Sequence, residues 1–323
     1  MERLDAFMAR ANAAYYASHD PFADFTTAPE ISQVFGEVLG LWAAVVWQAL
    51  GAPAPVLLVE AGPGRGTLMA DALRAIGRAA PAFRAALRLH LIETSPRLRA
   101  AQAQALQEAA WHDDMATLPD SPLILLANEF LDALPIRQFV RRGPVLCERF
   151  VADGRFVEMA GNIATPGLRE GEVIERSDAA RKFVAGLARR LTAHRGVALF
   201  LDYGPAVSAP GDSLQALRNG KPADPLGPVG SADLTAHVDF AALAEVARGA
   251  GAAVHGPLPQ GVFLTRLGLM QRTGVLARSQ PPERAAALIA ASRRLIEPDQ
   301  MGRLFKAMAL CSPACPTPPG FEA

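Results

Sequence analysis

The sequence predicts an α/β protein with a doubly wound, largely parallel sheet. Short apolar runs alternate with amphipathic helical patterns, as in successive βαβ units. The runs are apolar at nearly every position, which is typical of strands that helices cover on both faces. Several of them end in acidic or amide residues, at the edge where open α/β sheets bind ligands. We expect the main strands at 56–60, 87–93, 123–128 and 197–202.

Length, charge and cysteine content narrow the class of protein. The 323 residues can form one large domain or two small ones. Lys plus Arg and Asp plus Glu both number 32, so no overall field would draw the chain to nucleic acid or an anionic membrane. The longest uncharged apolar run, 38–47, is about half the length of a membrane helix. The three cysteines, Cys147, Cys311 and Cys315, show no paired metal-ligand spacing. Because residues 1–5 do not resemble a signal peptide, we expect a soluble cytoplasmic protein without a bound metal.

Residues 1–52 are predicted to form an N-terminal helical segment. The sequence Thr27-Ala28-Pro29-Glu30 matches a capping box with proline in the first helical turn. Apolar side chains then recur at helical spacing up to Val45, and the stretch 51–55 breaks the helix with Gly and Pro.

The main domain is expected over 53–311, with insertions near 136–195 and 204–240. Within the first insertion, 136–160 has the turn residues of a β-meander. In the second, 204–234 is rich in Gly, Pro and Asp without periodicity, which favours a long functional loop. Helices are predicted over 239–250, 262–277 and 281–295, and a closing edge strand over 304–310. The proline-rich residues 312–323 are predicted to be a flexible tail.

The strongest local signal is a glycine-rich turn after the first strand. Glu60 ends the strand, and Gly62, Gly64 and Gly66 alternate before the next helix. Glycine accepts positive φ and lets a ligand approach bare backbone. Dinucleotide sites favour G-x-G-x-x-G, whereas the spacing here is G-x-G-x-G. A carboxylate at Glu60 would repel a pyrophosphate but suits the cationic amino-acid part of S-adenosylmethionine. Another nucleotide, or a turn with a structural role only, remain alternatives.

Acidic residues after the next two strands fit the same cofactor. Glu93 ends the second strand, where a carboxylate can accept hydrogen bonds from both ribose hydroxyls. Asp113 and Asp114 follow a short third strand, where an acid can accept the adenine amino group. The alternatives are helix capping near Glu93 and solvated acids at 113–114.

A candidate reaction centre follows the fourth strand. It comprises Asn128, Glu129 and Asp132, one amide and two carboxylates. Methyl transfer is an in-line displacement that requires an aligned acceptor, and paired acids suit a guanidinium, which carboxylates bind bidentately. Alternatively, Asp132 caps a helix and Glu129 pairs with a surface Arg. The segments 202–204 and 233–239 could line the pocket, although capping or turn roles also explain them.

Many segments of the chain, in order, resemble one known family, the MidA-like class I S-adenosylmethionine-dependent methyltransferases. The resemblance covers nearly the whole sequence. It is carried by Tyr15-Tyr16, by 24–36, by the glycine turn 60–68, and by 93–96, 127–135, 202–204, 233–240 and 301–306.

The resemblance implies a Rossmann-like methyltransferase sheet and S-adenosyl-L-methionine as cofactor, held by Glu60, Glu93 and the three glycines. Its mitochondrial members are complex I assembly factors that dimethylate an arginine on a core subunit. It therefore implies an arginine-bearing protein client and places 24–36 in the active-site wall. The stretch 21–24 is shorter than the family pattern, and a histidine usual near Gly220 is absent. Both departures affect loops expected near the substrate. Composition suggests a bacterial, cytoplasmic member, whereas eukaryotic relatives work in the mitochondrial matrix.

Two hypotheses of different classes follow. The first is a protein arginine methyltransferase in which Glu129 and Asp132 hold the guanidinium. The second is a non-catalytic assembly factor that binds the cofactor and a client protein. Intact glycines and acids favour the enzyme, and the glycine spacing disfavours a nicotinamide oxidoreductase. The sequence names neither the client nor the oligomeric state.

Overall fold

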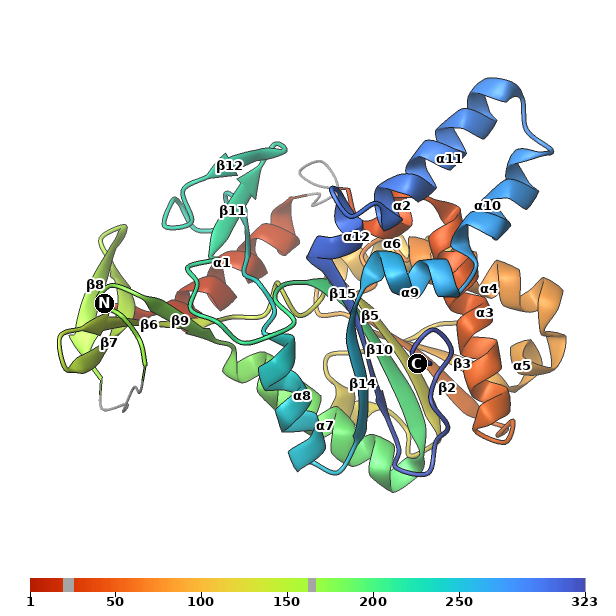
Figure 1. Ribbon diagram of the computed structural model, residues 1–323, viewed down its shortest axis with the longest axis horizontal. Coiled ribbons are helices and arrows are strands. Elements are labelled where there is room, and N and C mark those ends of the chain that lie inside the picture. The colour runs from red at the N-terminus through yellow and green to blue at the C-terminus, as the bar shows by residue number, and fades with distance from the viewer. Residues whose placement is uncertain (20–25, 162–166, 323) are drawn as a thin grey trace.

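A seven-stranded sheet forms the centre of the computed structural model, which describes residues 1–19, 26–161 and 167–322. The strand order is β14-β15-β10-β5-β2-β3-β4, and only β15 runs against the others (Figure 1). The predicted doubly wound α/β class is thereby confirmed. The strands are β2 (Val56–Ala61), β3 (Leu87–Ile92), β4 (Ala110–His112), β5 (Leu123–Asn128), β10 (Gly196–Tyr203), β14 (Ala253–Pro259) and β15 (Phe305–Cys311).

Helices cover both faces of the sheet, which explains the uniformly apolar strands. In β2, Val56 and Leu58 pack into one core and Leu57 and Val59 into the other. The first core is closed by α3 (Gln33–Ala49), α4 (Thr67–Ala79) and α9 (Gln260–Arg266), and the second by α7 (Asp178–His194) and α8 (Phe240–Gly249). Further helices are α5 (Pro81–Ala86), α6 (Pro96–Ala105), α10 (Leu269–Ala277), α11 (Pro282–Ile296) and α12 (Met301–Leu304).

The N-terminal segment is helical as predicted, but its second helix starts differently. After α1 (Leu4–Ser18), the chain forms a single turn, α2 (Ala28–Ile31), before α3. Thr27 makes no side-chain cap, and the Glu30 carboxylate accepts a hydrogen bond from the Thr67 hydroxyl instead. The extended residue Ser32 separates the two helices and caps α3 by accepting from the Val34 N–H. The capping-box prediction was therefore wrong, because Glu30 has a long-range partner.

Helices α3 and α4 approach closely through two glycines. A Cβ atom at Gly36 would lie 2.7 Å from the Asp71 Cβ, and one at Gly40 would lie 2.7 Å from the Ala72 Cα. Larger side chains at either position would push the helices apart. The later part of the segment 24–36 is thereby fixed to α4, the helix that follows the glycine turn. Residues 24 and 25, and with them the shortened stretch 21–24, lie outside the described residues.

The two insertions form separate small sheets beside α1 (Figure 1). The predicted β-meander is present as β6 (Arg137–Arg142), β7 (Val145–Ala152) and β8 (Arg155–Ala160), joined by β9 (Val173–Arg176) and β1 (Glu2–Arg3). The stretch 204–234 was predicted as a loop but contains a three-stranded sheet, β11 (Gln215–Arg218), β12 (Lys221–Ala223) and β13 (Asp233–Thr235). Its hairpin turns at Asn219 and Gly220, both at positive φ, as a two-residue Asn-Gly turn requires.

The C-terminal part differs from its prediction in three places. The helix expected over 262–277 divides at Gly268, whose φ is +80°. The strand β15 is not at the edge, because β14 lies outside it. The expected flexible tail is packed: the Trp42 indole N–H donates to the Pro319 carbonyl at 3.0 Å, and the Phe321 ring lies 5.0 Å from that of Phe263. The Phe321 ring and the Pro319 carbonyl thus anchor residues 312–322 to buried side chains of the domain.

Candidate active site

Strand register brings the predicted site residues to one edge of the sheet. Ala61 in β2 pairs with Ile92 in β3 and with Ala127 in β5. The acids that end or follow these strands therefore lie at the same level, as expected for the carboxyl ends of parallel strands. The structure thus gathers the glycine turn, Glu93 and the 128–132 segment in one place.

The glycine turn has the backbone conformation that its sequence predicts. Gly62, Gly64 and Gly66 have φ values of +66°, +55° and +82°, a region that disfavours other residues. The Gly62 N–H donates to the Ile92 carbonyl at 3.0 Å, which joins the turn to β3. A Cβ at Gly62 would also lie only 2.9 Å from the ring of Phe130. The turn is consequently held tightly between β3 and the segment after β5.

Glu60 is a buried carboxylate with unused hydrogen-bonding capacity. Its side chain is 3 % exposed, and its Oε2 atom has no hydrogen-bond partner among the described residues. Burial raises the pKa of Glu60 to about 8. A buried acceptor without a donor is costly, and a bound ammonium group would satisfy it. The residues present therefore fit the cationic amino-acid part of S-adenosylmethionine.

Glu93 is held by a network that was not predicted from the sequence. Its Oε1 accepts from the Ser95 N–H at 2.7 Å and its Oε2 from the Gln102 amide at 3.3 Å. The fully buried Gln102 also donates to the Gly64 carbonyl at 2.8 Å and accepts from the Trp111 indole. Gln102 follows Leu98 by four residues, so both lie on the buried face of α6. A polar residue at a buried helical position was the sequence signal that could have identified Gln102. Burial raises the pKa of Glu93.

Asp113 and Asp114 follow β4 and have partners within the protein. The Asp113 side chain is 81 % exposed and pairs with Arg99 at 2.7 Å. Asp114 caps the single-turn 3-10 helix Met115–Thr117 by accepting from the Ala116 N–H at 2.7 Å. Both residues are exposed, and Asp114 in addition caps a helical turn.

Glu129 has a strained backbone and a partner far away in sequence. Its φ is +49°, a conformation that costs a non-glycine residue about 1–3 kcal/mol and is found mainly at functional sites. Its Oε1 accepts from the Ala28 N–H at 3.0 Å and from the Asn128 amide at 3.1 Å. Burial, opposed by the Ala28 hydrogen bond and assisted by the charge of Asp132, raises the pKa of Glu129 to about 7. The buried Asn128 Oδ1 has no partner among the described residues.

Asp132 lies beside a second buried carboxylate, Asp202. The Asp132 side chain is 6 % exposed, and its Oδ1 has no partner within the described part of the chain. Burial raises the pKa of Asp132 to about 6, and the neighbouring Tyr203 hydroxyl opposes the shift. Burial and the charge of Asp132 also raise the pKa of Asp202. Among the described residues, Asp132 caps no helix and Glu129 pairs with no surface arginine, so the structure supports neither alternative role.

Helix α1 is joined by hydrogen bonds to three segments at the site. The Tyr16 hydroxyl donates to Asp233 at 2.8 Å, and the Ser95 hydroxyl donates to the Tyr16 carbonyl at 3.0 Å. The Asn12 amide donates to the Ala133 carbonyl, directly after Asp132, and to the Leu234 carbonyl. The Asn12 contacts join segments separated by more than 100 residues, so no local sequence pattern signalled them.

Comparison with known proteins identifies the family. A model of a family of S-adenosyl-L-methionine-dependent methyltransferases matches residues 38–258. The chain belongs to this family. A mitochondrial protein of Drosophila melanogaster, named as a homologue of the protein arginine methyltransferase NDUFAF7, is 33 % identical over 96 % of this chain and 80 % of its own length. Human mitochondrial protein arginine methyltransferase NDUFAF7 is 32 % identical over 92 % of this chain and 76 % of its own.

Solved structures of similar proteins agree with the assignment of this chain to a methyltransferase family. A Burkholderia thailandensis protein crystallised with S-adenosyl-homocysteine is 28 % identical, with a TM-score of 0.81 over 99 % of this chain and 88 % of the other. A native structure of a protein of the same superfamily from that organism has a TM-score of 0.79. The Rossmann-like methyltransferase fold and the S-adenosyl-L-methionine cofactor predicted from sequence are confirmed.

Other classes of site are not found in the described part of this methyltransferase. Among the residues that the structure describes, no group of three His, Cys, Asp or Glu side chains could hold a metal ion. Within the same residues, no helix combines the length and apolar character that crossing a bilayer requires.

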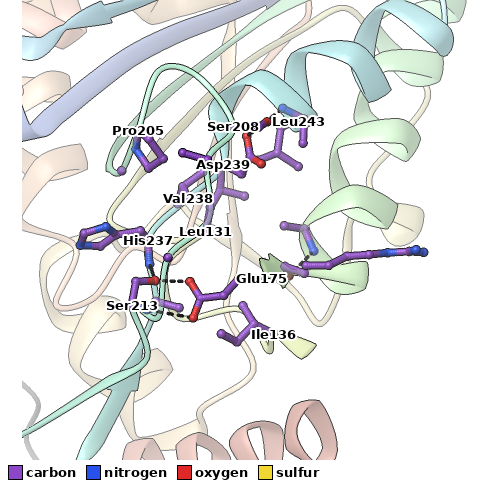
Figure 2. A pocket seen from close by; sticks show the side chains of 18 of the residues that line it. Leu131, Ile136, Glu175, Pro205, Ser208, Ser213, His237, Val238, Asp239 and Leu243 are labelled. Carbon is purple, nitrogen blue, oxygen red and sulfur yellow. Dashed lines mark hydrogen bonds between the residues drawn. The ribbon is translucent and has the colours of Figure 1, made fainter. Parts of the chain in front are cut away.

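A cavity of about 750 Å³ lies beyond the reaction centre, between α7, α8 and the segment 204–213 (Figure 2).

Proposed function

We propose that this S-adenosyl-L-methionine-dependent enzyme methylates an arginine side chain on a protein client. The observation that supports the proposal best is the pair Glu129 and Asp132. Both are carboxyls with raised pKa values of about 7 and 6, close enough for the charge of Asp132 to act on Glu129. A guanidinium presents five N–H donors in a planar fork and matches such a pair. The names of the mitochondrial relatives agree with this acceptor.

The cofactor-binding residues that we propose are Glu60, Glu93 and the three glycines. Glu60 would hold the ammonium group, because its Oε2 is buried without a partner among the described residues. Glu93 would hold the ribose, with Gln102 and Ser95 fixing its orientation. We assign the adenine amino group to the acids that follow β4, Asp113 and Asp114. When bound, the cofactor supplies an activated methyl group on a sulfonium centre.

The chain's own contribution to the reaction would be orientation and proton transfer. A guanidinium stays protonated in water, so one proton must leave as the nitrogen gains a methyl group. Glu129 is suited to accept it because its pKa lies near neutrality. Its Oε1 already accepts two hydrogen bonds, and no described residue donates to Oε2. We therefore assign the proton to Glu129 Oε2 and the fixed position of the guanidinium to Asp132, with Asn128 lining the site.

The experiment that tests this function uses labelled S-adenosylmethionine and a lysate of a strain lacking the gene. We expect one labelled protein band whose acid hydrolysate contains methylarginine. Label in methyllysine or in a small molecule would contradict the acceptor. A client that is bound but never labelled would favour a non-catalytic assembly factor. A respiratory complex I subunit is the client that the family resemblance predicts, and the bacterial cytoplasm is the predicted compartment.

A further inference from the structure

The cavity beyond the reaction centre has no role in the function proposed so far. Its volume is about 750 Å³, within the range of sites that bind drug-sized ligands. None of the residues assigned to the cofactor lines it. Much of its wall is apolar, and four of the apolar side chains that line it are labelled in Figure 2: Leu131, Ile136, Val238 and Leu243. The cavity can therefore take a side chain or a short peptide segment.

The cavity adjoins the proposed acceptor residues. Leu131 lines it and immediately precedes Asp132. Ala236 also lines it, and its N–H donates to the Asp132 carbonyl at 3.0 Å. The N–H of a third lining residue, Val238, donates to the Tyr203 carbonyl at 3.0 Å. A chain whose arginine reaches Asp132 would consequently have neighbouring residues at this opening.

The acids of the cavity are already occupied within the protein. Glu175 accepts from the Gln138 amide at 2.7 Å and from the Ser213 N–H at 3.0 Å, and the Ser213 hydroxyl also donates to it (Figure 2). Asp239 caps α8 by accepting from the Ala242 N–H and also accepts from the Ser208 hydroxyl at 2.7 Å. These carboxylates are therefore poorly placed to bind a cationic ligand.

Of the cations that line the cavity, Arg176 pairs with Asp178, but Arg181, Arg303 and Lys306 have no acidic partner among the described residues. Across the described ranges, the side chains of Arg181 and Arg303 make no hydrogen bond or ion pair. The Lys306 ammonium donates to the carbonyls of Arg303 and Leu304, and neither contact neutralises its charge. Arg303 and Lys306 belong to the segment 301–306, which carries part of the family resemblance but had no role assigned to it. The unused binding capacity of the cavity is thus cationic.

We propose that this cavity binds the client segment beside the target arginine, and that it selects an apolar residue together with an acidic one. The apolar wall would take the first, and Arg181 and Arg303 would bind the carboxylate of the second. The inference rests on the proposed arginine methylation. It adds that the client is recognised by opposite charges, a cation at Glu129 and Asp132 and an anion at the cavity.

The test measures peptide binding, so it does not depend on turnover. Fluorescein-labelled nine-residue peptides carry a central Arg flanked on both sides by Glu and Leu, and a matched set carries Lys in place of Glu. Anisotropy is recorded with saturating S-adenosyl-homocysteine. We expect the Glu peptide to bind roughly tenfold more tightly, the size of one charge-assisted contact. Arg181→Glu and Arg303→Glu should abolish or reverse this preference, whereas the exposed Arg278→Glu should leave it unchanged.

A third peptide separates this inference from the proposed function. It keeps the Glu and Leu residues but has Gln in place of the central Arg. Charge preference that persists with Gln supports the cavity even if arginine methylation fails. Equal binding of Glu and Lys peptides by wild-type protein overturns the inference, even if arginine is methylated. Unchanged S-adenosyl-homocysteine affinity verifies that each variant is folded.

Discussion

The carboxylate of Asp202 accepts a 2.8 Å hydrogen bond from the backbone N–H of Leu131. The same oxygen also accepts from the N–H groups of Phe130 and Asp132, at 3.1 and 3.3 Å, and the other oxygen accepts from the Tyr203 N–H. One buried side chain therefore fixes the segment that follows Glu129. This role explains an acid at the end of β10 better than direct contact with a ligand.

Replacing Asp202 with Asn should damage both stability and transfer. An amide group has only one acceptor oxygen, so a buried backbone N–H that now donates to Asp202 would face an N–H₂ group instead. We expect the free energy of unfolding to fall by about 1.5–3 kcal/mol in denaturant titrations. Asp224→Asn is the matched control, because that exposed side chain accepts a single N–H, from Leu226. Equal stability of the two variants would contradict the anchoring role.

Glu129→Gln and Asp132→Asn should lose methyl transfer while keeping the cofactor. In Glu129→Gln the amide oxygen can still accept from Ala28 and Asn128, so the shape of the site is preserved. Loss of one charge-assisted hydrogen bond, worth roughly 1.5–3 kcal/mol, corresponds to a decrease of about one to two orders of magnitude in kcat/KM. The exposed Glu245→Gln is the control. Full activity of both variants would place the acceptor elsewhere, and loss of S-adenosyl-homocysteine binding would place these acids on the cofactor side.

The rate should depend on pH through the same two carboxyls. Each must be ionised to attract the guanidinium, and burial raises their pKa values to about 7 and 6. We therefore expect kcat/KM to rise with pH and to level off above roughly pH 7, with apparent values that belong to the pair. In Glu129→Gln, the remaining activity should level off at a lower pH. An unchanged profile in that variant would exclude Glu129 as the group observed.

Gly64→Val should abolish cofactor binding. The φ of +55° is unfavourable for a β-branched residue, at a cost of about 1–3 kcal/mol, and the side chain would stand where the ligand approaches. Calorimetry with S-adenosyl-homocysteine should show heat for wild-type protein and none for the variant, and NAD should bind neither. Gly77→Val is the control, because Gly77 lies in α4 with open space around its Cβ position. Wild-type affinity in folded Gly64→Val would reduce the turn to a structural role.

Glu60 should make the ligand-free protein less stable as pH rises. Its pKa is about 8 in the folded protein and near 4.5 when unfolded, so the folded state binds more protons between these values. The free energy of unfolding should therefore decrease from about pH 4.5 to pH 8, by up to about 5 kcal/mol from this residue. Glu60→Gln should remove that part of the slope. Parallel curves for the two proteins would mean that Glu60 is not buried without a partner.

The sheet was predictable because each buried strand is a continuous apolar run, and its carboxyl edge gathers whatever residues follow. Glu60, Glu93 and Glu129 could be placed together on that ground alone. The strand β14 was missed because His255-Gly256-Pro257 interrupts its pattern with a bulge between His255 and Leu258. The hairpin in 204–234 did have a local signal, Asn219-Gly220, which the composition of the whole segment obscured.

Long-range contacts explain what the sequence did not predict in the site. The Glu129 partner, Ala28, lies 101 residues away, and the Asn12 partner Leu234 lies 222 residues away. Gln102 was recognisable as a polar residue on a buried helical face, but only the structure shows that it joins Glu93 to the glycine turn. Such pairings are set by tertiary packing, which local propensity and periodicity do not encode.

The short helix α2 has a thermodynamic consequence. Its Glu30 accepts from Thr67, the first residue after the glycine turn, and its Ala28 N–H donates to Glu129. One helical turn therefore contacts both the cofactor side and the acceptor side of the site. If the cofactor shifts α2 and thereby changes client affinity by some factor, the client must change cofactor affinity by the same factor. The two binding equilibria of this enzyme are then linked through one short turn of backbone.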